Sequence, residues 1–290
     1  MPLVNTGDLL HSALAGRFAV GGFEPYTIDQ IQAIIEVAEE EQTPVILQFW
    51  SEVIETWGFP TLTCVVRELA GRAAVPIALH LDHSLTEELA YQALEAGFTS
   101  VMYDGSKLPL EENIMRTRNV VARAKEFGAT VEAELGLIGF LSDYETPEEA
   151  MEAIKGLLTT PEQADYFVRE TGIDILAPAI GSIHGCPLPM AELDIPRIRA
   201  ISKVTGLPLA LHGGSGVGEA QLRAAIDAGI AKVNVDAEVR SVYITALKRE
   251  VEGVGTGDKV YVDLARYPRG VRTATKEAVR KRMRMLRNAG

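Results

Sequence analysis

The chain has 290 residues, 47% hydrophobic and 23% charged, a composition that excludes disordered and fibrous proteins. Its net charge of −12 argues against a nucleic-acid partner, and no apolar run reaches the ~18 residues of a membrane span. The first ten residues lack the features of a secretory signal, so we expect a globular, cytoplasmic protein without membrane association. The two cysteines are too few for a disulfide framework and have no CxxC spacing, so no thiol-based function is predicted.

Eight short apolar runs alternate with longer helical patterns along the chain. Most runs are apolar on both faces, as buried parallel strands are. Glycines such as Gly97, Gly128 and Gly172 stand just before the next run, where a helix C-terminus favours a residue that tolerates positive φ. The alternation predicts a single (β/α)8 TIM barrel over residues 1–290, with strands at 18–23, 44–49, 76–82, 99–104, 129–135, 173–179, 207–212 and 230–235.

Four helix starts are indicated by a Ser or Thr followed three residues later by Glu or Gln. In this capping box, the two side chains satisfy backbone N–H groups that the first helical turn leaves free. The predicted N-caps are Thr27, Ser84, Thr146 and Thr160.

Residues 136–171 interrupt the alternation because they are too many for a plain βα unit. Their first ten residues have no helical period. We predict a mobile loop and an extra helical segment over the barrel mouth, with a surface insertion as the alternative.

The C-terminal extension, residues 264–290, is predicted to be a basic helix. From Arg266 to Arg287 there are nine Lys or Arg and one acid, which leaves 19 basic and 39 acidic residues elsewhere. Val279, Met283 and Leu286 have the spacing of an amphipathic helix. We expect it to dock on the barrel or on a neighbouring subunit; an RNA-binding tail is the alternative.

Polar residues gather at the carboxyl ends of the predicted strands, which meet at one mouth of a TIM barrel. A single histidine there would be structural, but three imidazoles from separate strands predict a divalent transition-metal site with an open position for substrate. Strand alternation places His80 with Asp82, so His80 is interpreted as structural and His83 as turning in just past the strand end. The set is His80, Asp82, His83, Asp104, Glu132, Glu134, His184, His212, Asn234 and Asp236.

A glycine-rich turn follows the seventh predicted strand. Gly213, Gly214 and Ser215 let backbone N–H groups approach an anion, and the eighth strand brings Asn234 and Asp236 to the same place. The position predicts a substrate-binding loop that suits phosphate.

Six motifs, taken together, bring a known family into view. The chain resembles the class II zinc-dependent aldolases of the fructose-bisphosphate and tagatose-bisphosphate type over nearly its whole length. The motifs are HLDH from His80, YDGS from Tyr103, VEAELG from Val131, GSIHG from Gly181, LHGGS from Leu211 and KVNVD from Lys232.

The resemblance implies specific roles at the barrel mouth. It implies Zn²⁺, or another divalent transition metal, bound by His83, His184 and His212, with Asp104 and Glu134 serving an alternative or second metal position. Asp82 would handle the proton of the cleaved hydroxyl, and Gly185 would belong to the substrate site.

The resemblance also implies an assembly of identical subunits. We expect a homodimer or homotetramer in which the residue matching Arg269 reaches the phosphate of a substrate bound by the neighbouring subunit. The expected ligand is a small sugar or sugar phosphate.

Several positions depart from the family pattern, and they concern the substrate rather than the metal. Glu24 and Trp50 replace an asparagine and a serine, Ala237 replaces a threonine, and Ser142 stands where a loop glutamate is expected; the lysine after the His-Gly pair is absent. Such changes disfavour a phosphate dianion, so we expect a substrate other than fructose 1,6-bisphosphate. In the alternative interpretation, Trp50 fills space and Glu24 pairs with a surface base.

These observations favour metal-dependent retro-aldol cleavage, or aldol condensation, of a ketose or ketose phosphate through a zinc-stabilised enediolate. Two alternatives remain open from the sequence. One is an isomerase or epimerase that uses the same enediolate, and the other is a non-catalytic sugar-binding relative.

Overall fold

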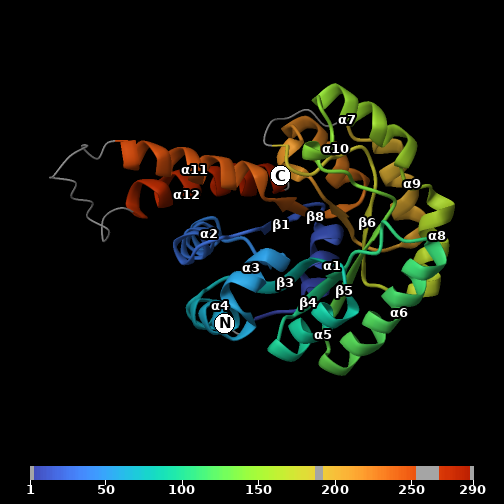
Figure 1. Ribbon diagram of the computed structural model, residues 1–290, viewed down its shortest axis with the longest axis horizontal. Coiled ribbons are helices and arrows are strands. Elements are labelled where there is room, and N and C mark those ends of the chain that lie inside the picture. Colours follow the sequence, from blue (N-terminus) through green and yellow to red (C-terminus); the bar gives the residue numbers. More distant parts are fainter. Residues whose placement is uncertain (1–2, 187–191, 253–267, 288–290) are drawn as a thin grey trace.

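The computed structural model describes residues 3–186, 192–252 and 268–287, and its centre is a closed barrel of eight parallel strands (Figure 1). The strands follow one another in chain order, and β1 pairs with both β2 and β8. Each predicted strand overlaps an observed one, which confirms the (β/α)8 fold. The strands are β1 (Val20–Phe23), β2 (Val45–Phe49), β3 (Ile77–Ser84), β4 (Ser100–Tyr103), β5 (Thr130–Leu135), β6 (Ile175–Pro178), β7 (Leu209–Leu211) and β8 (Ile230–Val235).

Helices surround the barrel and bury their apolar faces against the strands (Figure 1). None of the helices in the described ranges is long and apolar enough to cross a membrane. The helices are α1 (Thr6–Gly16), α2 (Ile28–Glu40), α3 (Ser51–Trp57), α4 (Phe59–Arg72), α5 (Glu87–Ala96), α6 (Leu110–Phe127), α7 (Pro147–Ile154), α8 (Pro161–Thr171), α9 (Ile195–Thr205), α10 (Glu219–Ala228), α11 (Ala237–Glu252) and α12 (Pro268–Leu286), with short 3₁₀ turns η1 (Leu141–Asp143), η2 (Lys155–Leu157) and η3 (Gly214–Gly216).

Three of the four predicted N-caps are confirmed, since Thr27, Thr146 and Thr160 each accept a hydrogen bond from the backbone N–H three residues on. The prediction for Ser84 is wrong. Ser84 is the last residue of β3 and its hydroxyl donates to the Met102 carbonyl, while Thr86 caps α5. The N-cap of α5 lies two residues after the predicted one because β3 extends beyond its apolar residues, to Ser84.

The amino-terminal helix α1 closes the barrel end opposite the polar strand ends. Leu10 and Ala13 pack with inward-facing side chains such as Ile46 and Ala210. Thr6 and Ser100 share a 2.6 Å hydrogen bond inside the barrel. The sequence patterns did not reveal this helix, and it seals the floor of the barrel beneath the candidate site.

The long segment after β5 contains an irregular stretch, η1, α7, η2 and α8. Its irregular part is fixed to the chain after β6, because the His184 N–H donates to the Gly139 carbonyl at 2.9 Å and the Leu141 N–H donates to the His184 carbonyl at 3.0 Å. The segment therefore reaches the barrel mouth beside His184. Its mobility stays a prediction.

The C-terminal helix α12 packs on the barrel, with Val279, Met283 and Leu286 buried in the main core. Its basic side chains pair with acids of α2, for example Arg280 with Glu40. Beyond this docked part, α11 and α12 run side by side away from the barrel (Figure 1). Residues 264–267 and 288–290 of the predicted helix lie outside the described residues.

Candidate active site

The end of β3 presents two functional side chains in succession on the same side. In a regular strand Asp82 and His83 would point to opposite faces. His83, however, has φ +47°, a left-handed conformation that non-glycine residues rarely adopt, and the pairing register with β4 shifts between Leu81 and Ser84. His83 thus turns toward the mouth within β3, not past its end as predicted.

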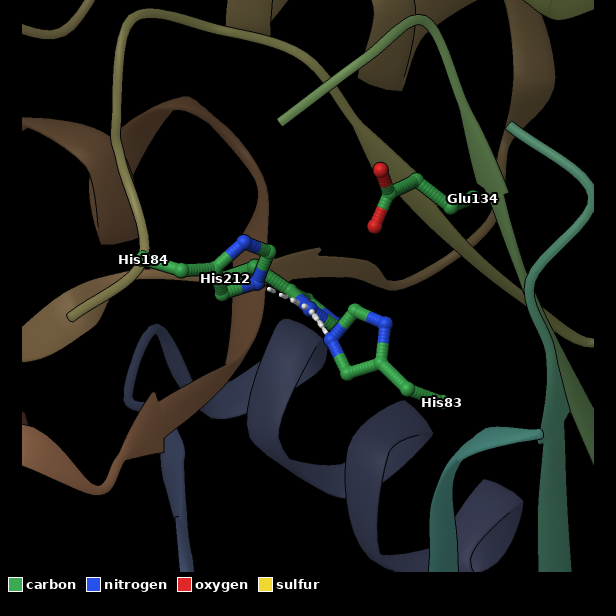
Figure 2. Close-up of side chains that lie close together, drawn as sticks. All are labelled: His83, Glu134, His184 and His212. Atoms are coloured by element: carbon green, nitrogen blue, oxygen red, sulfur yellow. Dashed lines mark hydrogen bonds between the residues drawn. The ribbon is translucent and has the colours of Figure 1, made fainter. Parts of the chain in front are cut away.

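Three imidazoles converge at the mouth, His83 from the end of β3, His184 from the chain after β6 and His212 from the residue after β7 (Figure 2). His212 Nδ1 lies 3.0 Å from His83 Nε2 and 3.3 Å from His184 Nε2. Glu134 joins them, so that one ligand atom from each of the four residues lies within 4.8 Å of the others. The four side chains, all within the described ranges, form a cluster that can hold a metal ion.

The second nitrogen of each imidazole has an acceptor outside the cluster. His83 Nδ1 lies 2.8 Å from Asp104 Oδ2, His184 Nδ1 lies 3.2 Å from the Ile138 carbonyl, and His212 Nε2 lies 2.8 Å from Glu132 Oε1. An N–H directed outward to an acceptor leaves the other nitrogen with its lone pair toward the cluster. This is the arrangement that metal-binding histidines require.

The residues fit a metal in spacing as well as in chemistry. Two nitrogens bound tetrahedrally at about 2.0–2.1 Å from Zn²⁺ would be about 3.3–3.4 Å apart, close to the separations observed. Glu134 Oε2 is buried and has no hydrogen-bond partner among the described residues, so a carboxylate oxygen is also free for a cation.

The protonation of the cluster follows from burial and from its acids. Burial lowers the pKa of His184 and of His212, which favours the neutral imidazole that a metal needs. Burial also opposes the charged form of His83, but Asp82 and Asp104 outweigh it and raise the pKa of His83 to about 9. Burial, assisted by Asp104, raises the pKa of Glu134 to about 8.

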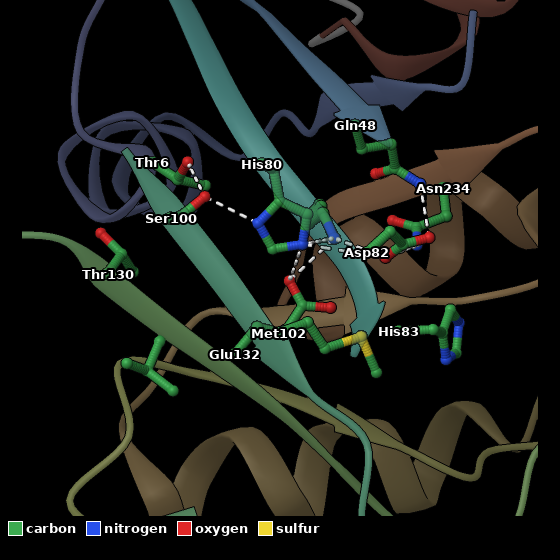
Figure 3. Close-up of polar contacts among 12 residues, drawn as sticks. Thr6, Gln48, His80, Asp82, His83, Ser100, Met102, Thr130, Glu132 and Asn234 are labelled. Carbon is green, nitrogen blue, oxygen red and sulfur yellow. Dashed lines mark hydrogen bonds and ion pairs between the residues drawn. The ribbon is translucent and has the colours of Figure 1, made fainter. Parts of the chain in front are cut away.

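Asp82 lies beside this cluster as a carboxylate held by amides (Figure 3). Its Oδ2 accepts a hydrogen bond from Gln48 Nε2 at 3.0 Å, and its Oδ1 accepts one from Asn234 Nδ2 at 3.3 Å. Burial would raise the pKa of Asp82, but His83 and Lys232 outweigh that effect and hold it well below its usual range. Asp82 is therefore ionised and fixed in orientation.

A buried polar network fills the barrel below the site (Figure 3). Lys232 Nζ lies 2.8 Å from Glu132 Oε2 and 3.4 Å from His80 Nε2, and His80 Nδ1 contacts Ser100 Oγ at 2.7 Å. Burial and Lys232 lower the pKa of His80 to about 3, so this imidazole is neutral. The structural interpretation of His80 agrees with this placement away from the imidazole cluster.

A cavity of about 490 Å³ opens above Asp82, His83 and His184. Several predicted substrate residues line it, whereas Gly214 and Arg269 do not. Asp104, a predicted metal ligand, lies behind His83. Gly214 is buried in η3, and Arg269 is exposed at the start of α12. The predicted residues in the wall are Glu24, Trp50, Asp82, His83, His184, Gly185, Gly213, Ser215, Asn234 and Asp236.

Other wall residues escaped the sequence analysis. Gln48 bridges Glu24 Oε1 and Asp82 Oδ2 through one amide nitrogen, and Phe140 stacks on the His184 ring with centroids 4.7 Å apart. Arg240, in the first turn of α11, also lines the cavity. Ser142, which the sequence analysis named in place of a loop glutamate, lies in the same wall. A polar Gln48 inside an apolar run was a usable signal; Phe140 and Arg240 gave none.

Comparison with known proteins identifies the family. The model of the class II fructose-bisphosphate aldolases matches residues 4–290. The chain is 38% identical over 298 residues to the 6-phospho-5-dehydro-2-deoxy-D-gluconate aldolase of Halalkalibacterium halodurans, covering 100% of this chain and 98% of that one. It is 40% identical over 252 residues to the fructose-bisphosphate aldolase of Geobacillus stearothermophilus, covering 86% and 85%.

A solved structure agrees in fold. The crystal structure of the YdjI aldolase from Escherichia coli K12 matches with a TM-score of 0.82 and 28% sequence identity, over 98% of this chain and 97% of that one. The likeness extends over the whole barrel and its helical extension.

Proposed function

The chain belongs to the class II fructose-bisphosphate aldolase family, whose members are metal-dependent carbon–carbon lyases, and we propose that His83, His184 and His212 hold its metal ion. The proposal is supported by the convergence of three imidazole nitrogens at 3.0 and 3.3 Å, each ring fixed by an acceptor on its other side. Zn²⁺ is the ion we propose, because nitrogen ligands in tetrahedral spacing suit it; another divalent transition metal would serve the same chemistry.

Two further acids have separate proposed roles near the metal. Glu134 supplies the carboxylate of an alternative or second metal position, since one of its oxygens has no partner in the described part of the chain. Asp104 orients His83 through its 2.8 Å contact with Nδ1, and we propose that it shares the alternative or second metal position with Glu134.

Asp82 is the proposed base of the cleavage step. When bound, the metal supplies Lewis-acid stabilisation of the negative charge that develops on the substrate oxygens. Asp82 accepts the proton of the hydroxyl on the carbon that becomes the aldehyde, and the electron pair of the broken C–C bond passes to the carbonyl half. Gln48 and Asn234 keep the carboxylate aimed at that hydroxyl.

The proposed substrate is a ketose phosphate. The relatives named above act, by their names, on a phosphorylated deoxy-sugar acid and on fructose bisphosphate. Glu24 adds a carboxyl group to the cavity wall and Trp50 adds an aromatic face. We therefore propose a ketose other than fructose 1,6-bisphosphate, bound by the loops that carry Gly185, Gly213 and Ser215.

We also propose a homodimer or homotetramer located in the cytoplasm. In this assembly Arg269, exposed at the start of α12, reaches the substrate phosphate in the neighbouring subunit's cavity. Light scattering coupled to gel filtration tests the assembly. In a second experiment, the wild-type protein is mixed with an Arg269→Ala, His83→Ala double variant. Loss of activity in the mixture would indicate that each site takes residues from two subunits.

The decisive experiment measures product identity and metal dependence together. Protein stripped with a chelator is reloaded with Zn²⁺, Co²⁺ or Mn²⁺ and offered ketoses that differ only in phosphorylation. Two fragments in equal amounts, formed only by the reloaded protein, are expected. A rearranged sugar of unchanged carbon number would contradict the proposal and indicate an isomerase or epimerase.

A further inference from the structure

The proposed cleavage leaves one proton transfer without an assigned group. Asp82 takes the proton of the hydroxyl, but the electron pair of the broken bond remains on a carbon of the ketone half, and that carbon must gain a proton before the product leaves. Asp82 then faces the new aldehyde oxygen with the proton that it has just accepted. A second acid in the wall would protonate the carbon without waiting for that proton to move.

The described part of the cavity wall holds three carboxyl groups outside the imidazole cluster, those of Glu24, Asp82 and Asp236. Both oxygens of Asp236 are engaged, because the Tyr26 hydroxyl donates to Oδ1 at 2.8 Å and Arg240 Nη2 lies 3.0 Å from Oδ2. The irregular segment after β5 adds no carboxyl group to this wall. Glu24 is therefore the group available as a second acid.

One amide links Glu24 to Asp82 across three neighbouring strands. Gln48 Nε2, in β2, donates to Glu24 Oε1 at 3.1 Å, just after β1, and, as Figure 3 shows, to Asp82 in β3, where Oδ2 lies 3.0 Å away. Gly22 makes room for this amide, since a Cβ atom there would collide with Gln48 Oε1. In the substrate, a single carbon atom separates the hydroxyl oxygen from the carbon that gains the proton, so the base and the acid must lie next to each other. Glu24 and Asp82 meet this requirement.

The two carboxyl groups differ in protonation. Glu24 is 7% exposed, and burial raises its pKa well above the ordinary value, with further contributions from Asp82 and Asp236. Glu24 therefore keeps a proton at pH values at which an exposed glutamate has lost it. The pKa of Asp82 is held below its usual range, because His83 and Lys232 outweigh its burial. Neighbouring groups whose pKa values are driven apart in this way are suited to act as acid and base in one reaction.

We propose that Glu24 is the acid that protonates the carbon of the ketone half, with Asp82 as the base for the hydroxyl. The inference rests on the proposed function. In cleavage, the hydroxyl proton goes to Asp82, the C=O bond of the aldehyde forms as the C–C bond breaks, and the carbon left with the electron pair takes the proton of Glu24. A single proton that passes from Asp82 to Glu24 then restores the resting state. In condensation the steps run in reverse, and ionised Glu24 removes the proton from the ketone.

Hydrogen exchange at the ketone fragment tests the proposal without bond cleavage. The Zn²⁺-loaded protein is mixed in D₂O with dihydroxyacetone or dihydroxyacetone phosphate, and proton NMR follows the loss of hydrogen from a hydroxymethyl carbon. We expect Glu24→Gln, which keeps the size and an acceptor for Gln48 but has no acidic proton, to slow this exchange at least about 100-fold. Glu24→Asp, which retains a carboxyl group on a shorter side chain, should slow it less.

Glu41→Gln is the matched control, since the Glu41 side chain is 8% exposed and pairs with Arg284 at 2.9 Å, outside the cavity wall. It should exchange hydrogen like wild type, and metal content and circular dichroism show whether each variant is folded and loaded. Equal exchange rates for Glu24→Gln and Glu41→Gln would overturn the proposal and leave Asp82 or water as the donor. If wild type exchanges hydrogen on neither ketone, the proposed function fails, and the role of Glu24 fails with it.

Trapping of the carbanion distinguishes an acid from a structural residue. Hexacyanoferrate(III) oxidises the carbanion and so removes the need to protonate it. With the ketose phosphate that wild type cleaves, this oxidant should raise the turnover of Glu24→Gln at least about tenfold and leave Asp82→Asn slow, because Asp82 acts before the carbanion exists. If the oxidant restores neither variant, Glu24 has a structural role, which contradicts the proposal.

Discussion

Glu132 Oε1 lies 2.8 Å from His212 Nε2 inside the barrel, and this contact determines which nitrogen of His212 faces the other imidazoles. The same carboxylate pairs through Oε2 with Lys232 at 2.8 Å. All three side chains are fully buried. The buried Glu132 carboxylate thus orients a candidate metal ligand and also pairs with Lys232. The effect on metal binding and the effect on stability can be measured separately.

Glu132→Gln should destabilise the protein by about 3–5 kcal/mol, because it leaves the Lys232 charge buried without its partner. The double variant Glu132→Gln, Lys232→Met should regain part of that loss. Urea unfolding measures both. Glu152→Gln, which breaks an exposed pair with Lys155, is the control and should change stability by less than about 1 kcal/mol. Equal effects of Glu132→Gln and Glu152→Gln would show that the buried pair is not a structural element.

Replacing any one of His83, His184 or His212 by Ala should remove most bound Zn²⁺ and leave the barrel folded. The strands that carry stability do not depend on these ligands. Metal content after dialysis and circular dichroism give the two readouts. His11→Ala, at an exposed position on α1, is the matched control and should retain metal. Full metal retention in His212→Ala would rule out the three-histidine site.

The barrel could be predicted from sequence because its strands are apolar on both faces and separated by capped helices. The strand ends could not be placed to the residue. At β3 the left-handed His83 and the register shift carry the strand to Ser84, and no local pattern encodes that bulge.

Candidate site residues at strand ends were predictable for the same reason that the barrel was. Their partners were not, since Glu132 meets Lys232 and His212 only when β5, β7 and β8 close side by side. Arg240 lies on a helix and forms an i,i+4 pair with Asp236. From the sequence alone such a pair indicates a solvent-exposed helix face, because only the structure shows the cavity beside it.

Asp82→Asn should leave metal content unchanged and reduce turnover by roughly 10²-fold or more. Asparagine keeps the shape but cannot accept the hydroxyl proton, and a general base is typically worth that factor. Steady-state kinetics of the reloaded variant measure the loss, with metal analysis on the same sample. Turnover near that of wild type would assign Asp82 a structural role.

Acid should destabilise the metal-free protein partly through His80. Its pKa is lowered from 6.5 to about 3 in the fold, so between these values the unfolded chain binds a proton that the folded chain does not. Stability contributed by neutral His80 is therefore present above pH 6.5 and is lost as pH falls toward 3. His80→Gln should reduce the slope of unfolding free energy near pH 5 by about 1.4 kcal/mol per pH unit. Identical slopes for wild type and variant, measured by urea unfolding with a chelator present, would contradict this.

The last prediction concerns Glu24, whose Oε1 accepts a hydrogen bond from Gln48 Nε2 at 3.1 Å in the cavity wall. The contact with Gln48 replaces the surface base considered from sequence. Burial and Asp82 raise the pKa of Glu24 well above its ordinary value, so repulsion of a phosphate should strengthen as pH rises and Glu24 ionises.

Glu24→Asn with Ala237→Thr removes that charge and adds a hydroxyl donor at the start of α11. This double variant should gain about tenfold in affinity for a C1-phosphorylated ketose, the worth of about one hydrogen bond, and lose affinity for the native substrate. Trp50→Phe, which keeps an aromatic face but removes an indole N–H that lacks a partner in the described structure, should leave that preference unchanged. Competition between phosphorylated and unphosphorylated ketoses at pH 6 and pH 8 provides the measurement. If the double variant and wild type show the same preference at both values, Glu24 does not determine specificity, and the loop that carries Ser142 becomes the next segment to vary.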